Sequence, residues 1–429
     1  MFRTELTPPL RALSALALFT GSLFATPSVT LDRVQQRYPW NGLVDIDYTI
    51  GYDAGEAELD PATDRLRFQV VNNLTHETNV AVRINGCQPL PVAAGKHRVT
   101  WDANADGVVF QSTDVTITLE VVHYGPKYLI IDVSEGPSAT NYPVAYTNLP
   151  PAGGFNTEEY KGNKIVLRLI PPGVFVAGSP TTEKNRKAEN EGQHSVVISK
   201  PFYIGIFETT QKQYENVSGK NNPASVYPGD YRPKENVSYN DLIGAYSRTK
   251  WPDTDEVDST TFFGKLRAKT SGLAFFLPTE AQWEYACRAG TTSDFGNGVV
   301  CADTDKQTAQ MRLLGRFVNN QVEDGSGYAT YHTTVGSYQP NAYGLYDMHG
   351  NVWELCCDWW RPNVAELEQL VDPRGGMVFR YGRVERGGGY GSAASDCRSA
   401  SRAELSVGNN GTAQRSESCG FRLVLPVND

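Results

Sequence analysis

The chain has 429 residues, of which 40% are hydrophobic and 20% charged, and its formal net charge is -9 at pH 7. This acidic balance argues against nucleic acid as a partner, because no segment concentrates lysine and arginine. The length exceeds that of one ordinary core, so we expect two domains. The 40 glycines and 25 prolines favour a β-rich or loop-rich protein over a helical one.

The first 25 residues have the pattern of a secretory signal peptide. Arg3 and Arg11 precede an apolar stretch over 12–25, and small residues end it at Ala25, which suits cleavage there. The stretch is too short to span a membrane, and no later segment approaches spanning length. We therefore expect residues 1–25 to be a signal peptide and the protein to be exported, either periplasmic or extracellular.

From residue 30 to 135 apolar and polar residues alternate, as in the series Val44, Ile46, Tyr48 and Ile50. Period-two alternation bounded by Gly, Asn and Asp predicts antiparallel strands, so we expect an immunoglobulin-like β-sandwich over 30–135. Residues 136–163 have the Pro, Gly, Asn and Thr bias of a linker. A second domain is predicted over 164–429.

Two segments of this second domain predict helices from their capping residues. Thr210 is followed three residues later by Gln213, and Thr279 by Gln282, which is the spacing of a capping box. Gly290 then predicts the end of the second helix.

Residues 341–360, NAYGLYDMHGNVWELCCDWW, combine an aromatic cluster with ligands that suit a hard cation. Asp347 and Glu354 are seven residues apart, and Gly350 permits a sharp bend between them. Backbone carbonyls of Gly350 and Val352 would complete the mixture of carboxylate and carbonyl oxygens that calcium prefers. The alternative interpretation is that Asp347 and Glu354 are capping or salt-bridging residues.

The same block belongs to an ordered series of segments that resembles the formylglycine-generating enzyme (sulfatase-modifying factor) family. The segments are IPPGVFVAGS at 170–179, FYIGIFETTQKQY at 202–214, RPKENVSYND at 232–241, LPTEAQWEYACRAG at 277–290, VGSYQPNAYGLYDMHGNVWE at 335–354, RVERGGGY at 383–390, CRSASR at 397–402 and GFR at 420–422. The resemblance implies an α+β fold related to C-type lectins and partly held by calcium.

Carried over by position, the resemblance places one calcium site on Asp347, Gly350, Val352 and Glu354. A second calcium site would fall within 317–331, where Asn319, Asn320 and Asp324 are loose candidates.

The resemblance also implies a copper(I) centre built from two cysteines five positions apart. In this chain the first position is Ser392 and the second is Cys397. A serine hydroxyl is a hard, neutral donor and a poor ligand for copper(I). Cys397 is then either a surviving catalytic thiol or a small buried residue, and Trp353 and Tyr390 are the candidate substrate-binding residues.

Two functions follow from these observations. We favour an exported scaffold, stabilised by calcium, that binds a peptide, a glycan or a protein and has a degenerate oxidase site. The alternative is a copper-dependent oxidase that converts a cysteine of a partner such as a sulfatase to formylglycine. The six histidines are scattered, so zinc or iron catalysis has no support. The pairing of the seven cysteines stays open.

Overall fold

The structure is a computed structural model. It describes residues 27–38, 41–52, 59–60, 64–73, 78–81, 84–85, 93–104, 106, 108, 115–220, 223–244, 251–320, 322–323, 328–329, 331–362, 371–375, 382–406 and 414–427. The predicted signal peptide, residues 1–25, lies outside the described residues. The chain divides into two compact units, Met1–Gly125 and Pro126–Asp429.

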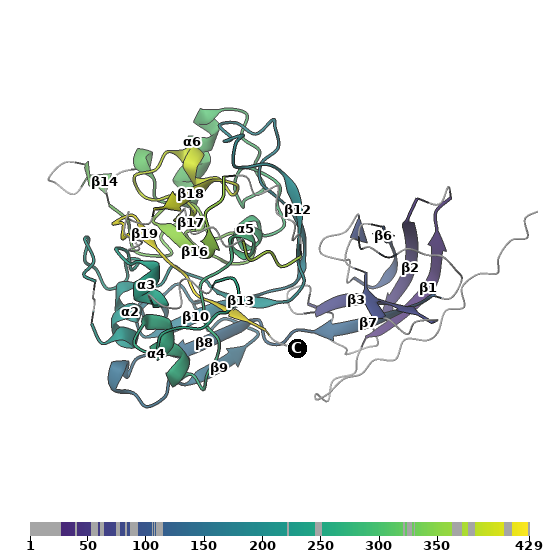
Figure 1. The fold of residues 1–429 in the computed structure, drawn as a ribbon, viewed down its shortest axis with the longest axis horizontal. Helices are drawn as coiled ribbons and strands as arrows, with labels where there is room; N and C mark the ends of the chain where they lie inside the picture. Colours follow the sequence, from purple (N-terminus) through teal and green to yellow (C-terminus); the bar gives the residue numbers. More distant parts are fainter. Residues whose placement is uncertain are drawn as a thin grey trace, which may run out of the picture. The chain divides into compact units, whose positions relative to one another are not determined.

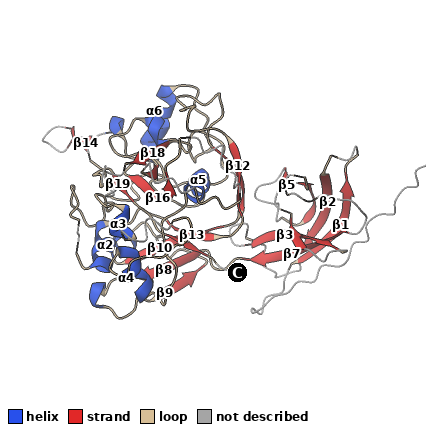
Figure 2. Ribbon diagram, viewed as in Figure 1, coloured by secondary structure: helices blue, strands red, loops and turns tan. Residues whose placement is uncertain are grey.

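The first unit is built from β-strands that form two antiparallel sheets. Its strands are β1 (Ser28–Gln36), β2 (Leu43–Gly51), β3 (Asp64–Asn72), β4 (Thr78–Val80), β5 (Ile84–Asn85), β6 (Gly95–Asp102) and β7 (Val115–His123). One sheet has the order β1-β2-β6-β5 and the other the order β4-β3-β7, and strands of both are drawn in red in Figure 2.

The alternation in the sequence explains the core of this unit. In β2, Val44, Ile46, Tyr48 and Ile50 are all buried while the residues between them are partly exposed. The rings of Tyr48 and Phe68 meet edge to face at 5.7 Å, which joins the two sheets across one hydrophobic core. The predicted antiparallel sandwich is therefore confirmed.

The second unit combines strands with short helices (Figure 1). Its strands are β8 (Tyr128–Asp132), β9 (Val144–Thr147), β10 (Lys164–Ile170), β11 (Gly173–Ala177), β12 (His194–Ile198), β13 (Phe202–Gly205), β14 (Val322–Glu323), β15 (Tyr328–Ala329), β16 (Trp353–Trp359), β17 (Arg383–Arg386), β18 (Arg402–Leu405), β19 (Cys419–Gly420) and β20 (Val424–Pro426). Its helices are α1 (Glu158–Gly162), α2 (Gln211–Ser218), α3 (Tyr239–Leu242), α4 (Phe262–Lys269), α5 (Glu280–Arg288) and α6 (Thr304–Leu314), with 3-10 turns at Gly136–Ser138, Val318–Asn320 and Ala394–Cys397.

The boundary between the units differs from the one that the sequence suggested. The expected linker, 136–163, contains β9 and α1, and β9 is the edge strand of the five-stranded sheet β20-β13-β10-β8-β9. Strand β8, expected in the sandwich, pairs with β10 in the same sheet. Composition misled here, because a Pro- and Gly-rich segment can still pair its backbone along the edge of a sheet.

Both predicted capping boxes form. The Thr210 hydroxyl accepts a hydrogen bond from the Gln213 backbone N–H at the start of α2, and Thr279 does the same with Gln282 at the start of α5. Helix α5 ends at Arg288, two residues before the predicted Gly290, because Ala289 takes the left-handed conformation with φ 45°. These caps fix where α2 and α5 begin.

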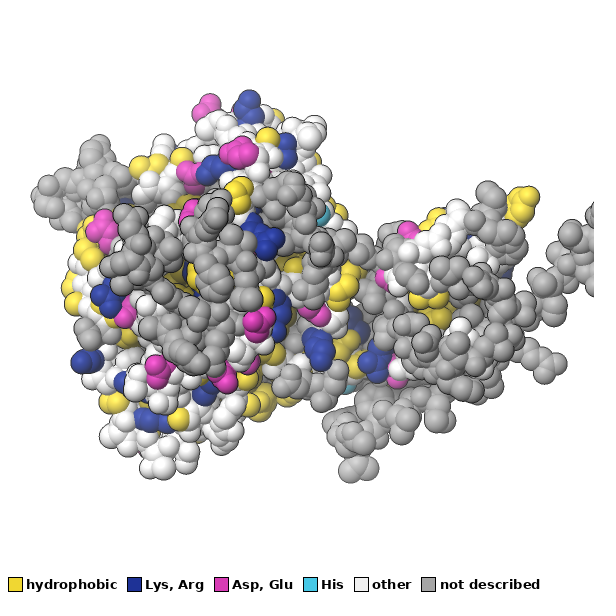
Figure 3. Space-filling view, in the orientation of Figure 1, with side chains coloured by type: hydrophobic (Ala, Val, Ile, Leu, Met, Phe, Trp, Pro, Cys, Tyr) yellow, Lys and Arg dark blue, Asp and Glu magenta, His cyan; other side chains and the backbone are white. Residues whose placement is uncertain are grey.

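A four-stranded sheet, β18-β17-β16-β19, carries Trp353 and Glu354 at the start of β16. Strand β16 pairs antiparallel with β17 and parallel with β19, so three distant segments of the chain meet there. No helix among the described residues is long and apolar enough to cross a membrane. On the face of the molecule that Figure 3 shows, the coloured basic and acidic side chains are interspersed.

Candidate functional site

The loop before β16 turns sharply at Gly350. Its φ is 89°, and a Cβ added there would lie 2.2 Å from the Arg316 carbonyl oxygen, so a side chain does not fit. Asp347 and Asn351 on either side also have positive φ, 56° and 66°. This compact turn brings Asp347 toward the start of β16, where Glu354 lies.

Glu354 is fully buried in an ion pair with Arg422. The Arg422 Nε and one Nη each lie 2.5 Å from a carboxylate oxygen, and Trp283 Nε1 donates to the same carboxylate at 2.8 Å. Arg422 also donates to the carbonyls of Gly205 and Tyr346 at 2.9 and 3.0 Å. In this structure the salt-bridging alternative describes Glu354.

Asp347 has one satisfied and one unsatisfied oxygen. Its Oδ2 accepts a hydrogen bond from the Gly336 backbone N–H at 2.6 Å, while Oδ1 is buried and has no hydrogen-bond partner among the described residues. Burial raises the pKa of this carboxyl to about 6, against the opposing hydrogen bond from Gly336. An oxygen that lacks a partner in the interior is a free position for a proton or a cation.

A third carboxylate, Glu208, lies beside these two and was not predicted from the sequence. It accepts hydrogen bonds from the Asn351 side chain at 2.6 Å and the Val352 backbone N–H at 3.1 Å. Burial, and then the negative charges of Asp347 and Glu354, raise its pKa well above the usual range. The one available signal was an acidic residue at the end of the apolar run FYIGIF.

These groups form what we call the carboxylate cluster: Glu208, Asp347 and Glu354 with Arg422. Three buried carboxyl groups share one guanidinium, with Lys161 also attracting Asp347, and the raised pKa values of Glu208 and Asp347 reflect burial and this crowding. Within the described part of the chain, however, no three His, Cys, Asp or Glu side chains converge as metal ligands. Calcium at this position stays a prediction.

Of the loose candidates for a second calcium site, Asn319 and Asn320 lie within the described residues. The Asn320 side chain is used locally, since it accepts from the Phe317 N–H and donates to the Gly315 carbonyl at 2.9 and 2.8 Å. Asn319 lies beside it in the same 3-10 turn. Asp324 lies outside the described residues.

The position of the first copper cysteine is taken by Ser392, which serves the backbone. Its Oγ accepts a hydrogen bond from the Gly389 N–H at 3.0 Å, and its own N–H donates to the Gly389 carbonyl at 2.9 Å. The hydroxyl therefore closes a tight turn after β17.

Cys397 is fully buried in an apolar cluster that contains Phe295, Cys301, Met311, Leu314, Phe317 and Ala394. Burial raises the pKa of its thiol far above the ordinary value, so the thiolate is disfavoured. Gly388 lies against it, and a Cβ at that glycine would come within 2.5 Å of the Cys397 sulfur. The six described cysteines are all buried and none forms a disulfide.

Trp353 and Tyr390, the predicted substrate-binding residues, lie beside this turn. Gly389 contacts Trp353, since a Cβ at that glycine would lie 3.2 Å from the indole ring. The Tyr390 ring meets Tyr227 edge to face at 5.8 Å, and Tyr227 meets Tyr331 at 5.5 Å. We call Tyr227, Tyr331, Trp353 and Tyr390 the aromatic patch.

Buried polar groups that were not predicted from the sequence as site residues, His332 and Glu235, lie next to the aromatic patch. His332 lies edge to face with Tyr227 and Tyr390, and its Nε2 is 3.6 Å from the Glu235 carboxylate. Burial lowers the pKa of His332, against the attraction of Glu235. Tyr227, Tyr331 and Trp353 are partly exposed to solvent, so their rings are accessible to a ligand. His332 and Glu235, which support the patch, are fully buried.

The comparisons with known proteins match the second unit. A family model described as the sulfatase-modifying factor enzyme 1-like domain matches residues 156–427. The formylglycine-generating enzyme of Mus musculus is 36% identical over 295 residues, which are 61% of this chain and 76% of that protein. The chaperone protein LppX of Paenibacillus barcinonensis is 31% identical over 260 residues, 54% of this chain and 86% of LppX.

Among solved structures, PvdO from Pseudomonas aeruginosa aligns with 61% of this chain and 94% of its own length, at 23% identity and a TM-score of 0.46. The matched family model spans more than half of the chain, and the ordered motifs that it covers build the second unit. The chain therefore belongs to the formylglycine-generating enzyme (sulfatase-modifying factor) family.

Proposed function

We propose that this protein is an exported binding scaffold of the family, stabilised by calcium, whose oxidase centre is degenerate. The observation that carries the proposal is the state of the two copper positions. Ser392 supplies a hydroxyl that is engaged in a backbone turn, and Cys397 supplies a thiol buried in an apolar cluster.

This pair does not suit copper(I). That ion selects soft thiolates, and here one donor is a hard hydroxyl while the other is held in its thiol form by burial. Cys356 and Cys357 could have replaced the missing thiolate, but both are fully buried and burial raises the pKa of both thiols well above the ordinary value.

Calcium fits the carboxylate cluster in part. Asp347 Oδ1 is buried without a hydrogen-bond partner among the described residues, and a cation there would favour the charged forms of Asp347 and Glu208, whose pKa values are raised. Asp347 would hold the ion together with the carbonyls of Gly350 and Val352, and Glu354 would join only by loosening its pair with Arg422. A calcium ion there would supply structural stabilisation by neutralising this charge.

The aromatic patch is the proposed binding surface. Tyrosine and tryptophan combine a large apolar area with a polar handle, which suits contacts to a peptide, a glycan or a partner protein. A relative that is named a chaperone protein, LppX, supports a non-oxidase use of this domain. Export is proposed from the pattern of residues 1–25.

The first experiment is a mass-spectrometric assay for conversion of cysteine to formylglycine. The protein without residues 1–25 is incubated with copper(I), oxygen and a peptide that carries Cys-x-Pro-x-Arg, beside a two-cysteine relative and the Cys397→Ser variant. We expect conversion by the relative alone. Conversion by this protein that disappears in Cys397→Ser would instead establish the alternative, a copper-dependent oxidase.

The calcium part is tested by thermal unfolding after chelation and after return of calcium. We expect calcium to raise the Tm of the wild type and to have no effect on Asp347→Asn. An equal response of both proteins would reject Asp347 as a ligand.

Binding is tested on peptide and glycan arrays with the variant Trp353→Ala. The control is Tyr38→Ala, which removes an exposed tyrosine of the first unit. Equal array signals for the two variants would reject the aromatic patch.

A further inference from the structure

A pocket in the second unit has room for a small organic molecule. Its lining comes from the ends of β12 and β20, from the residues that lead into α5, and from the segments around Trp251 and Arg374. Its free volume is about 430 Å³, and pockets that bind small molecules typically span ~300–1,000 Å³. None of the residues that line it belongs to the aromatic patch or the carboxylate cluster, so this site is independent of the proposed function.

The walls of this pocket are apolar and are held in place by hydrogen bonds. The rings of Trp251 and Phe276 stack at 5.4 Å with an interplanar angle of 23°. Phe276 and Val424 exchange backbone hydrogen bonds of 2.9 and 2.8 Å, and the Trp359 indole N–H donates to the Trp251 carbonyl at 3.2 Å. Leu277 adds a further buried apolar side chain to the lining. Because the fold itself holds these walls, a ligand pays little to order them.

Arg374 places an unpaired cation on this apolar wall. Its Cζ lies 4.3 Å from the centroid of the Trp251 ring, and its carbonyl accepts the Trp251 indole N–H at 2.9 Å. Arg374 is partly exposed, and among the described residues its guanidinium has no hydrogen-bond or ion-pair partner. Because one face of the guanidinium covers the indole, the N–H groups along its edge stay available to a ligand.

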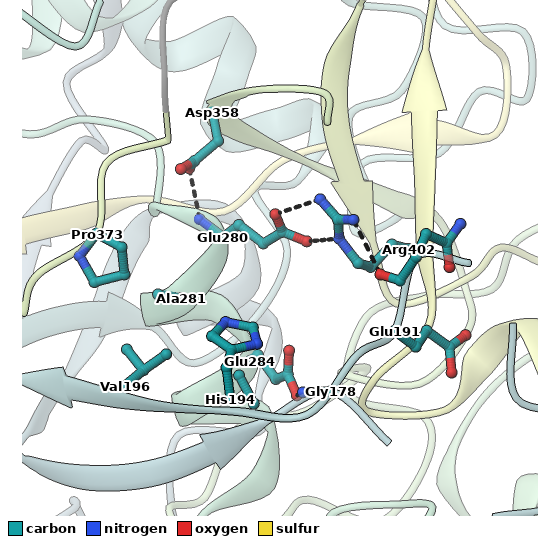
Figure 4. A pocket seen from close by; sticks show the side chains of 12 residues that line it. Gly178, Glu191, His194, Val196, Glu280, Ala281, Glu284, Asp358, Pro373 and Arg402 are labelled. Carbon is teal, nitrogen blue, oxygen red and sulfur yellow. Dashed lines mark hydrogen bonds and ion pairs between the residues drawn. The ribbon is translucent and has the colours of Figure 1, made fainter. Parts of the chain in front are cut away.

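A smaller pocket at the same end of α5 provides a contrast. Its free volume is about 30 Å³, which is room for one or two water molecules. There Arg402 donates to the Glu280 carboxylate at 2.9 Å, and Asp358 accepts the Glu280 backbone N–H at 2.6 Å (Figure 4). The arginine of the small pocket is therefore satisfied within the protein, whereas Arg374 is not.

The remaining charges in the lining of the larger pocket limit the charge of its ligand. Asp372 accepts the Ser199 backbone N–H at 2.7 Å and also the Ser199 hydroxyl, while Asp253 and Asp255 are exposed to solvent. With Lys200, the lining holds two cationic and three acidic side chains. A dianion such as a phosphate ester is disfavoured by these carboxylates, whereas a monoanion needs only the one guanidinium.

We propose that the larger pocket binds an organic carboxylate with an apolar body, and that the carboxylate pairs with Arg374. A guanidinium and a carboxylate match in two parallel N–H···O hydrogen bonds. The apolar body lies against Trp251, Phe276 and Leu277, where the burial of apolar surface favours binding. Two sources present the same chemistry: a free organic acid, and the C-terminus of a polypeptide with an apolar last residue.

The test uses the full chain without residues 1–25 in ligand-observed NMR titrations at pH 7. The probes for a free acid are phenylbutyrate, its carboxamide, phenylbutylamine and phenyl phosphate. The probes for a polypeptide are N-acetyl-leucyl-phenylalanine and its C-terminal amide. The variant is Arg374→Gln, and the matched control is Arg312→Gln, which removes an exposed arginine near the end of α6.

We expect saturable binding of both acids by the wild type and by Arg312→Gln with equal affinity. Their amides, and the acids with Arg374→Gln, should bind at least about tenfold more weakly, because a hydrogen-bonded charge pair is lost. Tighter binding of the acetylated dipeptide than of phenylbutyrate would identify a polypeptide C-terminus, and otherwise the free acid is the source.

Should Arg374→Gln fail to fold, Arg374→Lys and the wild type decide. Arg374→Lys keeps the positive charge but loses the planar fork, so it should weaken the acids and leave the amides unchanged. The proposal would be overturned by equal affinities of acid and amide for the wild type, or by undiminished binding of the acids to the Arg374 variants. Tighter binding of phenylbutylamine or phenyl phosphate than of phenylbutyrate would also overturn it, as would the lack of saturable binding by either acid.

Discussion

Removal of the Arg422 guanidinium tests whether the carboxylate cluster depends on it. In Arg422→Met the side chain keeps an apolar stem, but Glu354 loses its bidentate partner, and the carbonyls of Gly205 and Tyr346 lose their donor. Breaking a buried pair from one side costs ~3–5 kcal/mol, against a total stability of ~5–15 kcal/mol for a typical domain. We therefore expect the second unit to lose about a fifth or more of its stability.

The assay is urea unfolding in the presence of a chelator, monitored by tryptophan fluorescence. Trp283 is a suitable reporter because its indole N–H donates to Glu354. The matched control is Arg415→Met, which removes a partly exposed pair with Asp241 and should cost less than ~1 kcal/mol. Equal losses in Arg422→Met and Arg415→Met would refute the reasoning that burial makes the first pair essential.

Three further predictions follow from single residues. The Cys397 thiol should resist iodoacetamide at pH 8 in the folded protein and react on unfolding, as measured by mass spectrometry, because burial excludes the reagent and raises the thiol pKa; labelling of the folded protein would contradict this. Gly388→Ala should lower the Tm strongly, since φ is 76° and the new Cβ would clash with the Cys397 sulfur. Gly391→Ala should change the Tm little, since a Cβ at that position meets no atom of the described residues within 4 Å. Similar Tm values for the two variants would reject the packing argument. Asp358 binds a proton more tightly in the folded state, so its contribution to stability is present below pH 4 and lost as the pH rises to about 7. Denaturant titrations at pH 4, 6 and 8 should show this slope in the wild type relative to Asp358→Asn, and parallel curves would exclude it.

Local features of the sequence predicted much of the fold. The alternation around Tyr48 predicted the sandwich, and the capping boxes at Thr210 and Thr279 predicted where two helices begin, because each signal depends on residues a few positions apart. The ordered motifs predicted the family of the second unit. The linker over 136–163 was the exception, since pairing along a sheet edge depends on distant strands.

The sequence by itself determined the family, and it places Ser392 where the family resemblance implies a cysteine. Only the tertiary structure decided which charges are paired. Glu354 and Arg422 are 68 residues apart, and Glu208 and Asn351 are 143 apart. The spacing of acidic residues shows what could bind a cation, but the arginine that arrives from elsewhere in the fold decides whether a carboxylate is satisfied. For that reason Glu354 is paired with Arg422 in this structure, while burial raises the pKa values of Asp347 and Asp358.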